Sequence, residues 1–390
     1  MTENIELLCK EESKFLEIKD LYLNFNVYQG TVKVLDGIDL KMKKGEILGL
    51  VGETGCGKSV AMRSVVRLLE ANAKIEKGEI FFMGSQNLLE ISDNDLERIR
   101  GRNISMIFQE PMTYLNPTMK IGDQVSEGLI LHFREDIIKK GIELLKEKKG
   151  TLSKLYKKLL ELELNNHNSI LLKIFGRIPI INRYQQYINY AAKRESINAL
   201  RIVGMPTPER IAEQYTHELS GGMRQRVLIA IAIVCKPELI IADEPTTAVD
   251  VTTQFKILKV ILDLKEKYGT SILLITHNLG VISEICDRIY VMYAGQIVEI
   301  GDVVQIILHP FHPYSVGLMN AIHNIGDKNE LEEIDGNVPT LSNPPLGCRF
   351  HPRCHKAMKI CSIEKPKINM VEEGHFVSCW KYNEKSELNV

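Results

Sequence analysis

The segment GEILGLVGETGCGKSVAMRSVVRLLE, residues 45–70, decides the fold class of this 390-residue chain. Gly52, Gly57, Lys58 and Ser59 fit the G-x-x-x-x-G-K-[ST] pattern of a phosphate-binding loop. The apolar run at residues 47–51 predicts a buried strand before the loop, and the apolar residues after Ser59 recur at helical spacing. A strand, a glycine-rich loop and a helix in this order predict an α/β fold that binds a nucleoside triphosphate.

The chemistry of such a loop depends on its backbone as much as on its side chains. Loop N–H groups and the positive N-terminus of the following helix surround phosphate oxygens. Lys58 is expected to bind the β- and γ-phosphates, and Ser59 to ligate Mg²⁺. The loop residues expected to contact ATP are Gly52, Thr54, Gly55, Cys56, Gly57, Lys58, Ser59 and Val60.

Cys56, inside this loop, allows two interpretations. It can be a small filler with no chemistry of its own. Alternatively, the positive field of the loop lowers the pKa of the thiol and makes it reactive. In the second case, ATP should protect the protein from a thiol-alkylating reagent.

Polar residues follow two apolar runs further along the chain. In ELIIADEPTTAVD, the run at residues 239–242 ends in Asp243 and Glu244, and in TSILLITHN a second run leads to His277. Asp243 is expected to hold Mg²⁺ through its water shell, and Glu244 to act as general base on the attacking water. In isolation, His277 reads as a core or turn histidine. Beside two nucleotide motifs, it is instead expected to contact the γ-phosphate.

A further helix start lies between these two halves, in THELSGGMRQRVLIAIAIV. Ser220 is placed to cap the helix, and Gly221 and Gly222 leave its first turn open to a phosphate. One chain has no evident use for two such sites on one γ-phosphate. The motifs therefore predict a head-to-tail dimer, in which Ser220, Gly221 and Gly222 contact the ATP held by the partner chain.

Together, GETGCGKS, MIFQEPMTYLNP, LSGGMRQR, IIADEPTTAVD and His277 resemble the ATP-binding cassette of ABC transporters, over residues 14–308. The resemblance implies a RecA-like P-loop core with an antiparallel β subdomain and a helical subdomain at about 101–218. It also implies that Gln109 senses Mg²⁺ and water and that Asp250 lies at the dimer interface. For the aromatic residue that stacks on adenine, Phe25 is the best positional match and Tyr28 the second.

Other classes of cassette protein fit less well. DNA-repair and cohesion members carry long coiled coils between the two halves, and translation factors carry two cassettes, whereas each motif occurs once here. A formal net charge of −1 argues against wholesale nucleic-acid binding. No run of about 18 apolar residues occurs, and the start MTENIELLCK lacks a secretory pattern. A cytoplasmic subunit, peripheral to the membrane, is expected.

The stretches EPMTYLNPTMKIGDQVSEGL and HPFHPYSVGLMNAI resemble the ATP-binding subunits of bacterial oligopeptide and dipeptide importers, of which nickel importers are close relatives. This resemblance implies a heterodimer with a second, related ATP-binding subunit. It also implies two transmembrane permease subunits and an extracellular or periplasmic binding protein. Residues 309–345 read as a linker that contains the His-Pro-Tyr segment.

Residues 132–194 are longer than this subfamily usually has, and they read as helices. Between Glu135 and Arg194 there are 13 Lys or Arg and 6 Asp or Glu, a local charge of +7. The insert is either a helical hairpin with a solvated basic face, or a segment that lies near anionic headgroups or an acidic permease loop.

Four of the eight cysteines lie in a C-terminal module at residues 346–381. Disulfides do not last in the cytosol, which leaves metal ligation as the main reason to gather them. The segment GCRFHPRCHKAMKIC…HFVSC resembles the importer extension that holds a [4Fe–4S] cluster, with Zn²⁺ and unmetallated thiols as alternatives. A module this short is expected to lack its own core and to need such a staple. The expected ligands are Cys348, Cys354, Cys361 and Cys379.

Overall fold

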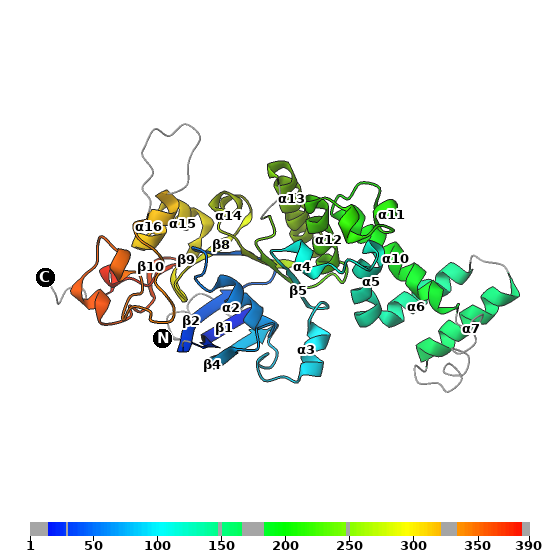
Figure 1. Ribbon diagram of the computed structural model, residues 1–390, viewed down its shortest axis with the longest axis horizontal. Coiled ribbons are helices and arrows are strands. Elements are labelled where there is room, and N and C mark those ends of the chain that lie inside the picture. The colour runs from blue at the N-terminus through cyan, green and yellow to red at the C-terminus, as the bar shows by residue number, and fades with distance from the viewer. Residues whose placement is uncertain are drawn as a thin grey trace. The chain divides into compact units, whose positions relative to one another are not determined.

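The computed structural model describes residues 15–28, 30–146, 150–165, 183–246, 250–320 and 334–383 (Figure 1). They fall into two compact units, of which the first comprises Met1–Leu96, Ile241–Glu244 and Leu262–Val390, and the second comprises Glu97–Ile240 and Pro245–Ile261. The strands are β1 (Leu16–Val27), β2 (Gly30–Met42), β3 (Ile47–Val51), β4 (Ala73–Phe82), β5 (Ile104–Ile107), β6 (Leu239–Asp243), β7 (Ser271–Ile275), β8 (Arg288–Tyr293), β9 (Gln296–Asp302), β10 (Asn369–Glu372) and β11 (His375–Val377).

The described helices are likewise given in chain order. They are α2 (Lys58–Val65), α3 (Asp93–Ile99), α4 (Pro111–Tyr114), α5 (Ile121–His132), α6 (Arg134–Lys146), α7 (Thr151–Asn165), α10 (Gln185–Ile202), α11 (Pro208–Ile211), α12 (Gly221–Ile233), α13 (Val251–Tyr268), α14 (Leu279–Ile285), α15 (Val303–Leu308) and α16 (Pro313–Asn320). Short 3₁₀ turns are η1 (Thr216–Glu218), η2 (His351–Arg353), η3 (Lys359–Ser362) and η4 (Trp380–Tyr382).

The first unit is built on a large sheet with the strand order β10-β11-β9-β8-β3-β7-β6. β3 runs parallel to both β7 and β8, and every residue of β3 and β7 is buried. Burial on both faces explains why these strands are continuous apolar runs rather than alternating ones. A separate antiparallel sheet has the order β2-β1-β4. The predicted α/β core and antiparallel β subdomain are confirmed.

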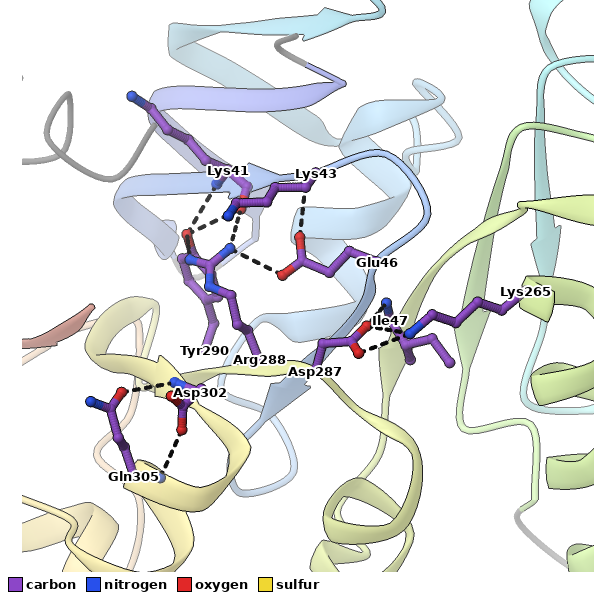
Figure 2. Close-up of polar contacts among 10 residues, drawn as sticks. All are labelled: Lys41, Lys43, Glu46, Ile47, Lys265, Asp287, Arg288, Tyr290, Asp302 and Gln305. Carbon is purple, nitrogen blue, oxygen red and sulfur yellow. Dashed lines mark hydrogen bonds and ion pairs between the residues drawn. The ribbon is translucent and has the colours of Figure 1, made fainter. Parts of the chain in front are cut away.

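Polar contacts fix the end of β3 that lies opposite the phosphate-binding loop (Figure 2). Asp287 accepts hydrogen bonds from the Ile47 backbone N–H at 2.7 Å and from the Lys265 ammonium at 2.7 Å. Beside it, Arg288 donates to Glu46 at 3.1 Å. Because β3 is anchored where it begins, its other end holds the loop in a fixed place at the carboxyl edge of the sheet, where open α/β sheets bind ligands.

The C-terminal module extends this same sheet. β11 pairs antiparallel with β9, and β10 pairs with β11. The module contributes buried apolar side chains at Phe350, Phe376, Val377 and Trp380. These strands complete a sheet that begins far away in the sequence, so the module belongs to the first unit and is not a separate segment held only by a staple.

A buried carboxylate joins the module to the His-Pro-Tyr segment. Glu299 on β9 lies 2.7 Å from Nε2 of His375 on β11, and it accepts hydrogen bonds from the backbone N–H groups of Phe311 at 2.7 Å and His312 at 3.0 Å. Nδ1 of His312 accepts a hydrogen bond from the Tyr314 N–H at 3.0 Å. Burial lowers the pKa of His312 to about 4, so this ring is neutral and can accept that bond.

In the second unit, the described parts of the insert are helical, as predicted. α6 and α7 pack on each other, and α10 packs on α5 and α6 (Figure 1). Their shared core includes Ile138, Leu160 and Ile188, and Arg134 forms an ion pair at 2.7 Å with the buried Glu163. The insert is thus part of a packed helical layer. The apolar run after α7, at residues 170–181, lies outside the described residues.

Among the described helices, none combines the length and the apolar composition that crossing a bilayer requires.

Candidate nucleotide-binding site

The phosphate-binding loop connects β3 to α2, and its backbone lies against the end of β8. Gly52 has φ +152°, and a Cβ at this position would lie 2.1 Å from the Met292 carbonyl oxygen. Gly57, at the start of α2, has φ +100° and would place a Cβ 3.0 Å from the side chains of Leu35 and Met292. Glycine is required at both positions, because this close approach leaves no room for a side chain.

Lys58 points back into the loop from the first turn of α2. Its ammonium donates to the carbonyl oxygens of Gly52 at 2.7 Å and Glu53 at 2.9 Å, and its side chain is buried. Thr54 and Gly55 form the exposed tip. The N–H groups in the first turn of a helix have no intrahelical acceptors, so the loop, Lys58 and the helix start form a cradle for anions.

Asp243, at the end of β6, meets this cradle at Ser59. The Ser59 hydroxyl donates to Oδ1 of Asp243 at 2.8 Å, whereas Oδ2 is buried without a hydrogen-bond partner. Burial raises the pKa of Asp243, and the Ser59 hydrogen bond and the charge of Arg63, whose Nη2 lies 4.0 Å from Oδ2, oppose that shift. A hydroxyl beside a carboxylate oxygen that accepts no hydrogen bond fits the oxygen ligands that Mg²⁺ prefers.

Glu244 and His277 form a second polar pair in the same unit. Nδ1 of His277 lies 2.9 Å from Oε1 of Glu244, and the Glu244 side chain is 12% exposed. Glu244 has a left-handed backbone with φ +48°, and its N–H donates to the Ile275 carbonyl at 2.9 Å. Strained backbone of this kind is common where a side chain is held for chemistry. The carboxylate is therefore fixed in orientation by its backbone and by the imidazole.

Structure decides between the two interpretations of Cys56. The side chain is fully buried, and burial raises the pKa of its thiol, although the neighbouring Lys58 ammonium opposes the shift. The reactive alternative is not supported, because a neutral and inaccessible thiol is a poor nucleophile.

Phe25 and Tyr28 lie at the hairpin end of the antiparallel sheet. Phe25 is partly buried and pairs with Val32 on β2 and Ala73 on β4. Tyr28 is fully exposed. Which of them contacts adenine stays a prediction, and Phe25 remains the better candidate because β1 holds it in place.

The remaining predicted residues belong to the second unit. Ser220 caps α12 by accepting a hydrogen bond from the Met223 N–H at 3.4 Å, as the sequence indicated. A Cβ on Gly222 would lie 3.0 Å from Thr253, whose hydroxyl donates to Asp250 at 2.7 Å. Asp250 thus holds the start of α13 beside the Ser-Gly-Gly turn. Gln109 is exposed after β5. The roles toward ATP stay predictions for the following residues: Gln109, Ser220, Gly221, Gly222 and Asp250.

Sequence reasoning missed the residues that support the loop from the C-terminal side. The Glu53 N–H donates to the Tyr314 hydroxyl at 2.8 Å, and the Glu53 carboxylate pairs with Arg353 at 2.8 Å. Tyr314 is fully buried, with its ring centroid 4.6 Å from that of Tyr293. The sequence shows that Arg353 directly precedes Cys354, but nothing in it indicates that Glu53 is the partner of Arg353.

The four tail cysteines lie near one another as free thiols. Cys348 donates its N–H to the Cys361 carbonyl at 2.8 Å. Burial raises the pKa of Cys348 to about 12 and of Cys379 to about 11, with smaller contributions from the charges of the other tail cysteines. Across the described ranges, no three His, Cys, Asp or Glu side chains stand in a metal-ligating arrangement. The thiols are gathered but do not form a ready-made cage.

The three histidines of the C-terminal module have partners other than a metal. His351 contacts the Cys348 carbonyl at 2.9 Å, His355 lies 3.5 Å from Asp335, and His375 is buried against Glu299. The cysteines are therefore the better candidates for any metal bound here.

A β-strand, glycine loop and helix, with Asp243 at the end of β6 in the same sheet and Glu244 directly after it, define a P-loop ATPase. A family profile described as "ABC transporter" matches residues 35–247, and one described as "Oligopeptide/dipeptide transporter, C-terminal region" matches residues 298–361. The chain belongs to the ABC transporter family of ATP-binding proteins and is an ATPase of that family.

Similar proteins span nearly the whole chain. The dipeptide transport ATP-binding protein DppD of Bacillus subtilis is 38% identical over 377 residues, 96% of both chains. The oligopeptide transport ATP-binding protein OppD of Haemophilus influenzae is 40% identical over 374 residues, 96% of this chain and 99% of that one.

Solved structures show the same fold. The ATP-binding cassette MJ0796, in a dimeric post-hydrolysis state bound to ADP and Pi, aligns with a TM-score of 0.55 at 21% identity, over 74% of this chain and 99% of that one. The protein cbiO1 of Clostridium perfringens, part of the transporter complex cbiONQ, aligns with a TM-score of 0.53 at 23% identity, over 76% of this chain and 92% of that one.

Proposed function

We propose that this chain is the ATP-hydrolysing subunit of a bacterial importer for oligopeptides or dipeptides. The observation that carries the proposal is the match of residues 298–361 to the C-terminal region of oligopeptide/dipeptide transporters. Relatives named for peptide transport support it, because they align over almost the full length of both chains. The cassette does not itself contact the cargo, so peptide import rests on these similarities rather than on site geometry.

Hydrolysis follows from the arrangement of the first unit. Lys58 would exchange its bonds to the loop carbonyls for phosphate oxygens, and Ser59 and Asp243 would hold Mg²⁺, which neutralises charge on the β- and γ-phosphates. Glu244 would accept a proton from the attacking water as the water's oxygen bonds to the γ-phosphorus and the bond from that phosphorus to the bridging oxygen of ADP breaks, which releases ADP and phosphate. His277 would contact the γ-phosphate, and its Nδ1, 2.9 Å from Oε1 of Glu244, would hold that carboxylate in position.

The working assembly would be a head-to-tail dimer with a second, related ATP-binding subunit. The open position of Gly221, where a Cβ would meet no atom within 4 Å, leaves the start of α12 accessible to a partner's ATP. Gln109 and Asp250 would lie at the contacts with the permease and the partner subunit. Two permease subunits and an external peptide-binding protein complete the importer, with this chain at the cytoplasmic face of the membrane.

The tail cysteines would hold a [4Fe–4S] cluster, with Zn²⁺ as the alternative. Four free thiols within electrostatic range of one another support this, since four thiolates suit either group. This proposal is tested by measuring the iron, sulfide and zinc content of protein that is purified without oxygen. About four iron and four sulfide per chain, lost in Cys354→Ser, would support the cluster; one zinc and no colour would support Zn²⁺ instead.

Uptake by cells tests the importer proposal. In a strain that lacks this chain, we expect growth of an amino-acid auxotroph on di-, tri- and pentapeptides to fail. The wild-type chain should restore growth, whereas Lys58→Ala, produced at the same level, should not. If peptide uptake is unchanged in the deletion strain and nickel uptake is lost, the cargo assignment is wrong although the ATPase assignment stands.

A further inference from the structure

Glu53, the second residue of the phosphate-binding loop, is held on three sides. Its carbonyl accepts from the Lys58 ammonium at 2.9 Å, and its N–H donates to the Tyr314 hydroxyl at 2.8 Å. Its carboxylate accepts two hydrogen bonds from Arg353, Nη1 to Oε2 at 2.8 Å and Nη2 to Oε1 at 3.1 Å. A two-pronged ion pair of this kind fixes both position and direction.

Arg353 is rigid at the other end of this pair. It closes the turn η2 directly before Cys354, and its side chain is 7% exposed. Its Nε donates to the Asp335 carbonyl at 2.8 Å, and its guanidinium lies over the Tyr293 ring at 5.7 Å from the centroid. Because these contacts already hold the guanidinium in place, forming the pair with Glu53 orders little that was not ordered before.

A second arginine reaches the loop through the turn that follows β8. Arg349, next to Cys348, is 5% exposed, pairs with Asp36 at 3.4 Å and donates to the Ala294 carbonyl. The next residue after Ala294 is Gly295, whose N–H donates to the carbonyl of loop residue Cys56 at 2.8 Å. Each of two arginines beside a tail cysteine thus makes such a contact: Arg353 with the loop, and Arg349 with the turn that is hydrogen-bonded to the loop.

We propose that Arg353 is a positioning residue for the ATP site, acting through Glu53 to hold the phosphate-binding loop in its nucleotide-binding shape. The C-terminal module is then part of the machinery that binds ATP, although it contributes no group to the nucleotide. Loss of the pair should weaken ATP binding. Without the pair the loop is not held in shape beforehand, so part of the binding free energy must be used to order it. Loss of the pair should leave the hydrolytic step unchanged, because the pair holds the loop and supplies no group to the attacking water.

Three variants of the pair test this: Glu53→Gln, Arg353→Met and the double variant. Affinity is measured by calorimetric titration of the purified chain with AMP-PNP and Mg²⁺, and kcat and KM by phosphate release. We expect each single variant to raise Kd about tenfold, with kcat within about twofold of wild type. The double variant should also show a rise of about tenfold, since both substitutions remove one interaction. Arg353→Lys, which keeps the charge without the fork, should fall between.

Arg201→Met is the matched control, because it breaks an exposed ion pair with Glu209 at 2.6 Å in the second unit. It should leave Kd, KM and kcat unchanged. The proposal is overturned if folded Glu53→Gln binds AMP-PNP like wild type, if kcat falls while Kd does not, or if the two losses multiply in the double variant. Circular dichroism confirms folding; if Arg353→Met does not fold, Glu53→Gln and Arg353→Lys decide the question.

Discussion

The backbone of Glu244 predicts an unusual effect of glycine at a catalytic position. Glu244 has φ +48°, in the left-handed region that side chains with a Cβ disfavour. Replacing it by alanine removes the carboxylate but keeps the Cβ and its strain, whereas glycine removes both. We expect Glu244→Gly to be more stable than Glu244→Ala, although both lose ATP hydrolysis.

Two opposing contributions set the size of the difference. A left-handed backbone costs a residue with a Cβ about 1–2 kcal/mol. Glycine loses about 0.5–1 kcal/mol through its greater freedom in the unfolded chain. The glycine variant should therefore be about 0.5–1 kcal/mol more stable than the alanine variant. At an ordinary helical position the sign is reversed, and glycine is the less stable of the two by about 1 kcal/mol.

Thermal unfolding of the nucleotide-free protein measures the comparison, and two other positions calibrate it. Met83 is exposed with φ +51°, so Met83→Gly should also be more stable than Met83→Ala. Glu284 is exposed within α14, so there glycine should be less stable than alanine. Differences of this size should shift the midpoint by about 0.6–1.2 °C in a chain of this length. Phosphate release should fall at least about 100-fold in both Glu244 variants.

One result would refute the reasoning. If glycine at position 244 lowers stability as much as glycine at position 284 does, the left-handed backbone of Glu244 carries no strain. The orientation of the carboxylate would then come from side-chain contacts such as the one with Nδ1 of His277. In that case His277→Ala should lower ATPase activity.

Three further predictions concern the same unit. Ser59→Ala removes the hydroxyl beside Asp243, and the Mg²⁺ concentration that supports half-maximal ATPase should rise at least about tenfold. His312 has a pKa of about 4 in the folded chain and about 6.5 in the unfolded chain, so between these pH values only the unfolded chain binds the proton. The free energy of unfolding, measured with urea, should therefore fall by about 3 kcal/mol as pH falls from 7 to 4. In His312→Asn the free energy of unfolding should fall less over the same pH range. Cys56 is buried, so its alkylation by iodoacetamide, followed by mass spectrometry, should track unfolding in urea, and fast labelling of folded protein would contradict its burial.

Local patterns in the sequence were sufficient for the parts of the site that depend on local structure. The apolar run at residues 47–51 is β3, the helix after the loop begins at Lys58, and Ser220 caps α12. Strand, loop and cap signals act over a few residues, so they could be read without knowing the tertiary structure. Asp243 and Glu244 followed from the same logic, since they end an apolar run.

Contacts between distant segments could not be read in this way. Glu53 and Arg353 are 300 residues apart, and Glu53 and Tyr314 are 261 apart. Periodicity gives the face on which a side chain lies, but it does not identify the partner that meets it. The C-terminal module shows the same limit, because its cysteines suggested a separate stapled segment while its strands complete the sheet of the first unit.

The position of the two arginines gives the cysteine module a physical connection to nucleotide binding. Arg349 and Arg353 each neighbour a cysteine, and the same turns therefore place both the thiols and the groups that hold the loop. Coupling between two sites is reciprocal: if binding a metal at the cysteines orders these turns and favours ATP, ATP must favour the metal by the same factor. Among the described residues, Glu53 is the loop residue to which Arg353 donates, so exchanging the Glu53 charge removes this connection while leaving the cysteines and the nucleotide ligands in place.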